Sequence, residues 1–65
     1  MHIFGREAKF NIGDQVRVQK PRDKHNGETA AVRSIAAHSD RFTYDLEFGK
    51  RQVWYEEHEL LRGNQ

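Results

Sequence analysis

Four histidines and three clustered glutamates are the side chains of this sequence with the chemistry to hold a metal ion. They are His2, His25, His38 and His58, with Glu56, Glu57 and Glu59 near the carboxyl end. Zinc sites bring histidine, cysteine or carboxylate ligands together through short, regular spacings. The histidines form no HxxxH pair, and the chain contains no cysteine. We therefore expect no metal and no cofactor, and we interpret the glutamates as an acidic end of the domain.

Catalysis would need a nucleophile with a base, paired carboxylates or a phosphate-binding loop. Ser34 and Ser39 have no marked partner, and the chain has no glycine-rich phosphate loop. We therefore expect a protein that is not an enzyme.

Trp54 is the residue best suited to contact a partner. Val53 and Tyr55 are expected to face inward from one strand, so the residues between and beside them face outward. An exposed tryptophan offers a large contact area with only two rotatable side-chain bonds. The predicted partner-binding surface consists of Trp54, Gln52 and Arg17. The alternative is that Trp54 packs beneath the amino-terminal segment or closes one end of the domain.

A basic loop offers a second candidate surface. Residues 21–27 carry Arg22, Lys24 and His25, which suit the neutralisation of phosphate groups. The alternative is a solvated loop whose charges favour solubility, and Asp23 within it supports that alternative. The candidate nucleic-acid surface consists of Arg17, Arg22, Lys24, Arg33 and Trp54.

The element that must position these residues is the strand predicted over residues 41–48. Its apolar residues are Phe42, Tyr44, Leu46 and Phe48, which alternate with Arg41, Thr43, Asp45 and Glu47. Strict alternation is typical of a half-buried strand, with one set facing the core and the other facing solvent. The rest of the chain must supply the surface that covers the apolar set.

Shorter strands are predicted over residues 15–20, 29–35, 51–55 and 60–61, with a 3₁₀ turn within residues 56–60. The spacing of Val32 and Ile35 breaks alternation and predicts a bulge or sharp bend. Gly49-Lys50 fits a two-residue hairpin link. We expect an all-β domain, a five-stranded barrel over residues 10–62 with a 3₁₀ turn before its last strand. Residues 1–9 would form a leader, either frayed or an extra edge strand, and residues 63–65 a frayed end.

Composition limits the class of protein. The chain has 65 residues, 35% hydrophobic and 32% charged, which suits one small domain of modest stability. The absence of cysteine fits a reducing cytoplasm. No apolar run approaches a membrane span or a signal peptide. The net charge of +1 is low for a dedicated nucleic-acid binder but leaves room for a local basic patch.

The opening motif resembles the start of KOW and Tudor-type barrels, which are SH3-like. It comprises Ile12-Gly13-Asp14-x-Val16-x-Val18, Asn26-Gly27 and Val32-x-x-Ile35. The Tyr44-x-Leu46-x-Phe48 strand and closing Glu59-Leu60 are similar to small accessory barrels such as that of photosystem I. The resemblance implies an SH3-like barrel, and it implies that the basic loop contacts RNA or a protein partner.

We therefore expect a non-catalytic binding module, a protein-interaction or accessory subunit of a larger complex. The alternatives are a KOW or Tudor-like nucleic-acid-binding domain and a homo-oligomer joined through a strand edge. A more remote resemblance is to type II dihydrofolate reductases, which are pore enzymes. Their pore glutamine falls on Val53 when the two sequences are aligned, and this argues against that activity.

Overall fold

The computed structural model describes residues 2–3 and 6–63. Its strands are β1 (His2–Ile3), β2 (Arg6–Glu7), β3 (Gln15–Val18), β4 (Thr29–Ala37), β5 (Phe42–Phe48), β6 (Arg51–Glu56) and β7 (Leu60–Arg62), with a 3₁₀ turn η1 (Glu57–Glu59) before β7. The predicted all-β class, with five main strands and a 3₁₀ turn before the last, is confirmed. Within the described residues, no helix is long and apolar enough to cross a membrane.

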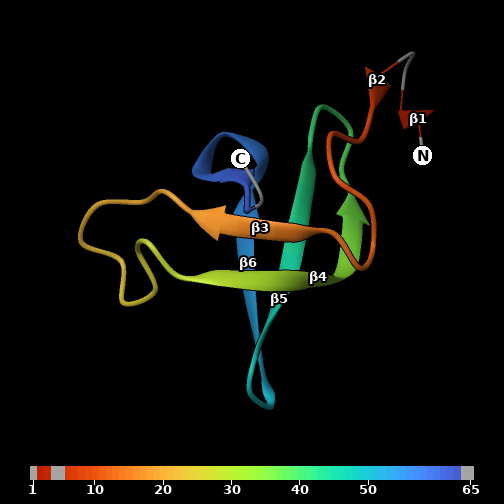
Figure 1. The fold of residues 1–65 in the computed structure, drawn as a ribbon. Helices are drawn as coiled ribbons and strands as arrows, with labels where there is room; N and C mark the ends of the chain where they lie inside the picture. Colours follow the sequence, from red (N-terminus) through yellow and green to blue (C-terminus); the bar gives the residue numbers. More distant parts are fainter. Residues whose placement is uncertain (1, 4–5, 64–65) are drawn as a thin grey trace.

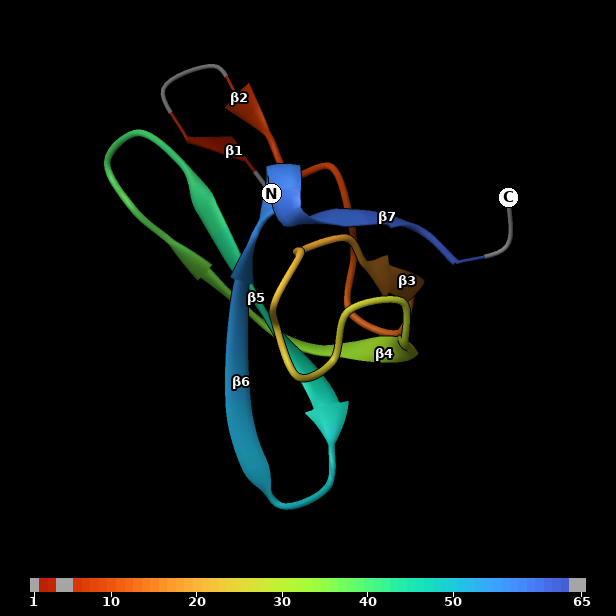
Figure 2. The same cartoon turned by 90° about the vertical axis from the view of Figure 1, so that its left-hand side faces the viewer.

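One antiparallel sheet holds the five main strands in the order β6-β5-β4-β3-β7. Figures 1 and 2 show this sheet strongly curled, with β3 and the start of β4 crossing the long β5–β6 hairpin. In the described part of the chain β6 and β7 remain edges, so the sheet does not close into a ring. The five-stranded barrel expected from the sequence is thus present as an open, curled sheet.

The curl depends on a bend within β4. Residues 29–31 of this strand pair with β3, whereas residues 32–37 pair with β5. The register shifts between Val32 and Ser34, where Arg33 is the extra residue. A bulge bends a strand and increases its twist. The irregularity predicted from the spacing of Val32 and Ile35 is therefore confirmed.

The inner side of the curl is the hydrophobic core. Its buried residues are Phe10, Val16, Val18, Ala30, Val32, Phe42, Tyr44, Leu46, Tyr55 and Leu60. The predicted inward set of β5 is confirmed for Phe42, Tyr44 and Leu46, while Phe48 is half-buried. Asp45 was expected to face solvent with the polar set, and this was wrong, because its side chain is fully buried.

The β5–β6 hairpin turns tightly at Gly49 and Lys50, as predicted, and pairs Phe48 with Arg51. Gly49 has a φ of +76°, whereas Lys50 is not among the residues of positive φ. Glycine at the first central position is the type II′ pattern, whose twist matches that of the flanking strands. The hairpin can therefore extend beyond the rest of the sheet, as Figure 1 shows.

The two chain ends are only partly described. β1 pairs with β2 in a separate two-stranded sheet, and residues 1, 4 and 5 of the predicted leader lie outside the described residues. At the other end Gly63 donates its N–H to the Gln15 carbonyl at 2.8 Å. A Cβ at Gly63 would lie 2.8 Å from Thr29 Cγ2, so this close approach requires glycine. Residues 64 and 65 of the predicted frayed end lie outside the described residues.

Replacement of Leu46 by alanine should lower the free energy of unfolding by roughly 2–5 kcal/mol, because Leu46 is fully buried and surrounding side chains fill such a space only in part. Urea unfolding followed by far-ultraviolet circular dichroism measures the change. Leu61→Ala is the matched control, because Leu61 is 44% exposed on the edge strand β7. Equal losses in the two variants would contradict the assigned faces of the sheet.

Candidate functional site

Trp54 lies on the outer side of the β5–β6 hairpin. Trp54 is 40% exposed, and it pairs across the strands with Asp45. Gln52, two residues earlier on β6, is also exposed. The predicted outward orientation of Trp54 is confirmed by this exposure. Its role in binding stays a prediction.

Beneath this outer side a buried ion pair holds three strands together. Arg33 donates from Nε to Asp45 Oδ2 at 3.0 Å and from Nη2 to Asp45 Oδ1 at 3.3 Å. The guanidinium also donates to the carbonyls of Gly49 and Arg51, at 3.2 and 2.9 Å. Val53 N–H donates to Asp45 Oδ1 at 3.1 Å. The Asp45 carboxylate raises the pKa of Arg33, so this side chain stays charged and engaged within the hairpin.

Arg17 is not brought to Trp54. It lies exposed on β3, and both β4 and β5 stand between β3 and β6. Arg17 is therefore three strands away from Trp54 in the order of the sheet. The predicted partner-binding trio therefore divides, with Trp54 and Gln52 together and Arg17 apart.

The basic loop, residues 21–27, is held against the hairpin by a hydrogen bond between Tyr55 and Asp23 and by stacking of His25 on Phe48. Tyr55 donates its hydroxyl to Asp23 Oδ2 at 2.7 Å, and His25 N–H donates to the same oxygen at 2.9 Å. The His25 ring stacks on Phe48, with centroids 3.9 Å apart and planes 5° apart. These contacts place the loop directly beside the hairpin. The sequence did not indicate this position of the loop.

A cleft of about 340 Å³ lies between this loop and the hairpin, and we call it the hairpin cleft. Its lining residues are Asp23, Lys24, His25, Phe48, Arg51, Gln52, Val53 and Tyr55. It thus brings together Gln52 and Lys24, which the sequence had assigned to different surfaces. Among the described residues Lys24 and Arg51 have no ion-pair partner. The cleft is therefore lined by two cationic side chains, Lys24 and Arg51, that are available to bind an anion.

The polar bonds of the cleft shift two pKa values in opposite directions. The Tyr55 hydroxyl and the His25 N–H lower the pKa of Asp23 below its ordinary value of 3.8. Burial and the Asp23 carboxylate raise the pKa of Tyr55 above its ordinary value of 10.0. Asp23 is therefore an anion and Tyr55 a neutral donor at neutral pH, so both are committed to holding the loop.

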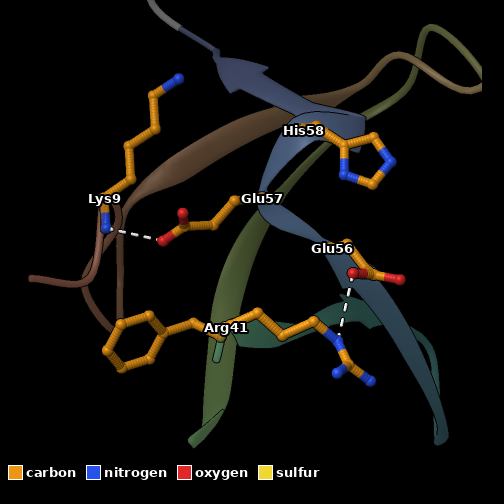
Figure 3. Close-up of a pocket in the computed structure, with 6 residues that line it drawn as sticks. Lys9, Arg41, Glu56, Glu57 and His58 are labelled. Carbon is orange, nitrogen blue, oxygen red and sulfur yellow. Dashed lines mark hydrogen bonds and ion pairs between the residues drawn. The ribbon is translucent and has the colours of Figure 1, made fainter. Parts of the chain in front are cut away.

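A second pocket, of about 350 Å³, lies beside η1 and is lined by Lys9, Arg41, Phe42, Glu56, Glu57 and His58. Figure 3 shows Glu57 pointing toward the Lys9 backbone and Arg41 pointing toward Glu56, while the His58 ring points away from Glu57. Lys9 N–H donates to Glu57 at 3.0 Å, the buried Tyr44 hydroxyl donates to the same carboxylate, and Arg41 Nε lies 3.2 Å from Glu56. Arg41 and Glu56 pair with each other, and Glu57 accepts hydrogen bonds from two other segments, so we interpret this pocket as a joint between segments.

The remaining predicted residues are scattered. Arg22, which has a φ of +71°, and Lys24 are exposed on the basic loop, whereas Arg33 is engaged with Asp45. Within residues 2–3 and 6–63 no group of three or more histidine, cysteine or acidic side chains could hold a metal ion.

Sequence reasoning missed Arg51 and the stack of His25 on Phe48. Arg51 directly follows the Gly49-Lys50 turn and precedes Gln52, and this position was the available signal that it lies near the Trp54 strand. Nothing in the spacing of His25 and Phe48 indicated their contact, because it depends on where the basic loop folds.

Comparisons with protein-family models, curated proteins and solved structures found no match to this chain. The fold therefore defines the class by itself: a small all-β domain built on one five-stranded antiparallel sheet. The candidate functional site of this domain is the β6 strand. Trp54 lies on the outer face of this strand, and the hairpin cleft lies on the opposite face.

Both tyrosines of the chain should ionise only as the protein unfolds in alkali. Burial and bonds to carboxylates raise the pKa of Tyr44 and of Tyr55 above 10.0, so the folded state favours the neutral phenols. The stability that they contribute is complete below pH 10 and is lost as the pH rises above it. Tyrosinate absorbance and circular dichroism, recorded in one titration, should change together. A tyrosine that titrates near pH 10 while the dichroism stays native would contradict this.

Asp45→Asn should lower the free energy of unfolding by about 1.5–3 kcal/mol, the scale of hydrogen bonds to charged groups. The amide keeps the size of the side chain but loses the charge that Arg33 pairs with. Glu47→Gln is the matched control, because Glu47 is exposed on the same strand, and it should change stability by less than about 0.5 kcal/mol. Thermal denaturation measures both variants, and similar losses would show that the ion pair contributes little.

Proposed function

We propose that this chain is a non-catalytic protein-binding module with an SH3-like architecture that acts as a protein-interaction or accessory subunit. The observation that carries the proposal is Trp54, a large aromatic side chain 40% exposed on an edge strand. Tryptophan is enriched among the residues that dominate protein interfaces, because it buries much area at low entropic cost. Among the described residues, its indole N–H has no hydrogen-bond partner and is free to donate to one.

The position of Trp54 supports the proposal further. The Arg33–Asp45 pair and the type II′ turn fix the hairpin beneath the indole, so the surface is rigid before a partner arrives. A rigid surface loses less conformational entropy on binding than a mobile one. Gln52 adds a polar group on the same strand, at the edge of the contact area.

Nucleic-acid binding is the second candidate, and it is favoured by Arg22 and Lys24. Both are exposed on the basic loop and have no ion-pair partner among the described residues. Two features count against it. Arg33 uses its guanidinium within the hairpin, and Arg17 lies three strands from Trp54, so the five predicted contacts do not form one surface.

Trp54→Ala should fold almost as well as the unaltered protein but lose most of its peptide binding. A library of displayed short peptides is selected on the unaltered protein, and the enriched peptides are then titrated against each variant. We expect about a tenfold or greater loss of affinity, since truncation of a dominant interface residue costs about 2 kcal/mol or more and a tenfold loss corresponds to about 1.4 kcal/mol.

Leu61→Ala is the control for the loss of an exposed apolar side chain, because Leu61 is similarly exposed on the opposite edge strand. It should bind the enriched peptides as the unaltered protein does. Enriched peptides that bind the Trp54→Ala variant equally well would overturn the proposal.

A further inference from the structure

The β6 strand has one free side over residues 51–55, and at its end Glu56 N–H donates to Glu59 Oε1 of η1 at 2.9 Å. β5 pairs with it on one side, and no described strand pairs with it on the other. Two bonds show which of its backbone groups point toward β5: the Arg51 carbonyl accepts from Arg33, and Val53 N–H donates to Asp45. Alternate residues of an antiparallel strand direct their N–H and C=O groups to opposite sides. The N–H and C=O groups of Gln52 and Trp54 therefore point away from β5, to the free side.

The two faces beside this free edge differ in chemistry. Trp54 lies on the outer face, and the hairpin cleft lies on the other, where Val53 and Tyr55 line it. A strand added to β6 would place successive side chains on alternate faces. Every second side chain would thus lie on the face that carries the indole, and the ones between on the face that carries the cleft.

The cleft favours an acidic side chain. Lys24 and Arg51 have no anionic partner among the described residues. The carboxylate that lines the cleft belongs to Asp23, and it already accepts bonds from the Tyr55 hydroxyl and the His25 N–H. A glutamate or aspartate brought into the cleft would therefore meet two free cations and a carboxylate that is already satisfied.

A peptide fits the free edge better than an oligonucleotide does. Gln52 and Trp54 present donors and acceptors in alternation, and a peptide backbone matches both. The phosphate oxygens of an oligonucleotide backbone only accept hydrogen bonds, so that backbone cannot supply the regular alternation of donors and acceptors that the edge presents.

We propose that β6 binds an extended acidic peptide as an additional strand, with acidic side chains in the hairpin cleft and apolar side chains against Trp54. This inference rests on the proposed function and specifies its partner. The ligand is recognised by a pattern in which acidic and apolar residues alternate. The peptide backbone supplies the shared hydrogen bonds, and Lys24 and Arg51 select the charge.

The probe is a fluorescein-labelled peptide that alternates glutamate and valine, measured by fluorescence anisotropy. We expect saturable binding below about 1 mM. Three probes test the recognition: a lysine–valine peptide, a peptide of the same composition with glutamates and valines in separate blocks, and a glutamate–valine peptide with alternate backbone amides methylated. Each should bind about tenfold more weakly or not at all, since each removes the charge, the alternation or the backbone donors.

Lys24→Gln and Arg51→Gln should each weaken binding about two- to fivefold, the scale of exposed ion pairs. Gln15→Glu is the matched control, because it lowers the net charge by the same one unit at an exposed site on β3. It should leave binding unchanged.

Three results would overturn the inference: no binding at about 1 mM, equal binding of the lysine–valine peptide, or tighter binding of a single-stranded oligothymidine that weakens equally in the Lys24 and Arg51 variants. If the alternating peptide fails while displayed peptides still bind through Trp54, the proposed function stands and this inference falls. If neither binds, both fall.

Discussion

The ion pair between Arg33 and Asp45 joins three strands at the place where β4 bends. Arg33 is the extra residue of the bulge, so it leaves the regular pairing of β4 and reaches over β5 to the backbone of the β5–β6 hairpin. A carboxylate as buried as Asp45 would be costly without partners. Here it has an arginine and a backbone N–H. The bend, the buried charge and the fixed hairpin therefore depend on one another.

Two buried tyrosines perform a related role at the margins of the core. Tyr44 accepts from Phe10 N–H and donates to Glu57, which ties the chain before β3 to η1. Tyr55 donates to Asp23 and so ties the basic loop to β6. A chain of 65 residues without cysteine has little core and no disulfides. Hydroxyls that reach from the core to surface segments give it order that its apolar area alone would not provide.

The sequence was informative where a local rule decides the structure. Alternation along residues 42–46 predicted the core face of β5, the spacing of Val32 and Ile35 predicted the bulge, and Gly49-Lys50 predicted the turn. It failed where distant segments meet. Asp45 has the periodicity of an exposed residue, and its burial depends on partners from two other strands, Arg33 and the Val53 N–H. Phe10 and Ile12 stand in one turn with similar hydrophobicity, yet Phe10 packs against Tyr44 while Ile12 is 67% exposed. The hairpin cleft was equally hidden, because stacking of His25 on Phe48 joins residues 23 positions apart.

The chain contains a single tryptophan, and it stands on the free edge strand, cross-strand from the fully buried carboxylate of Asp45. Its emission thus reports on one place in the molecule alone. Trp54 is 40% exposed in the free protein, so an occupant that covers the indole would shift the emission toward shorter wavelengths by excluding solvent. The intrinsic fluorescence of Trp54 therefore reports directly on occupancy of the surface on which the proposed function depends.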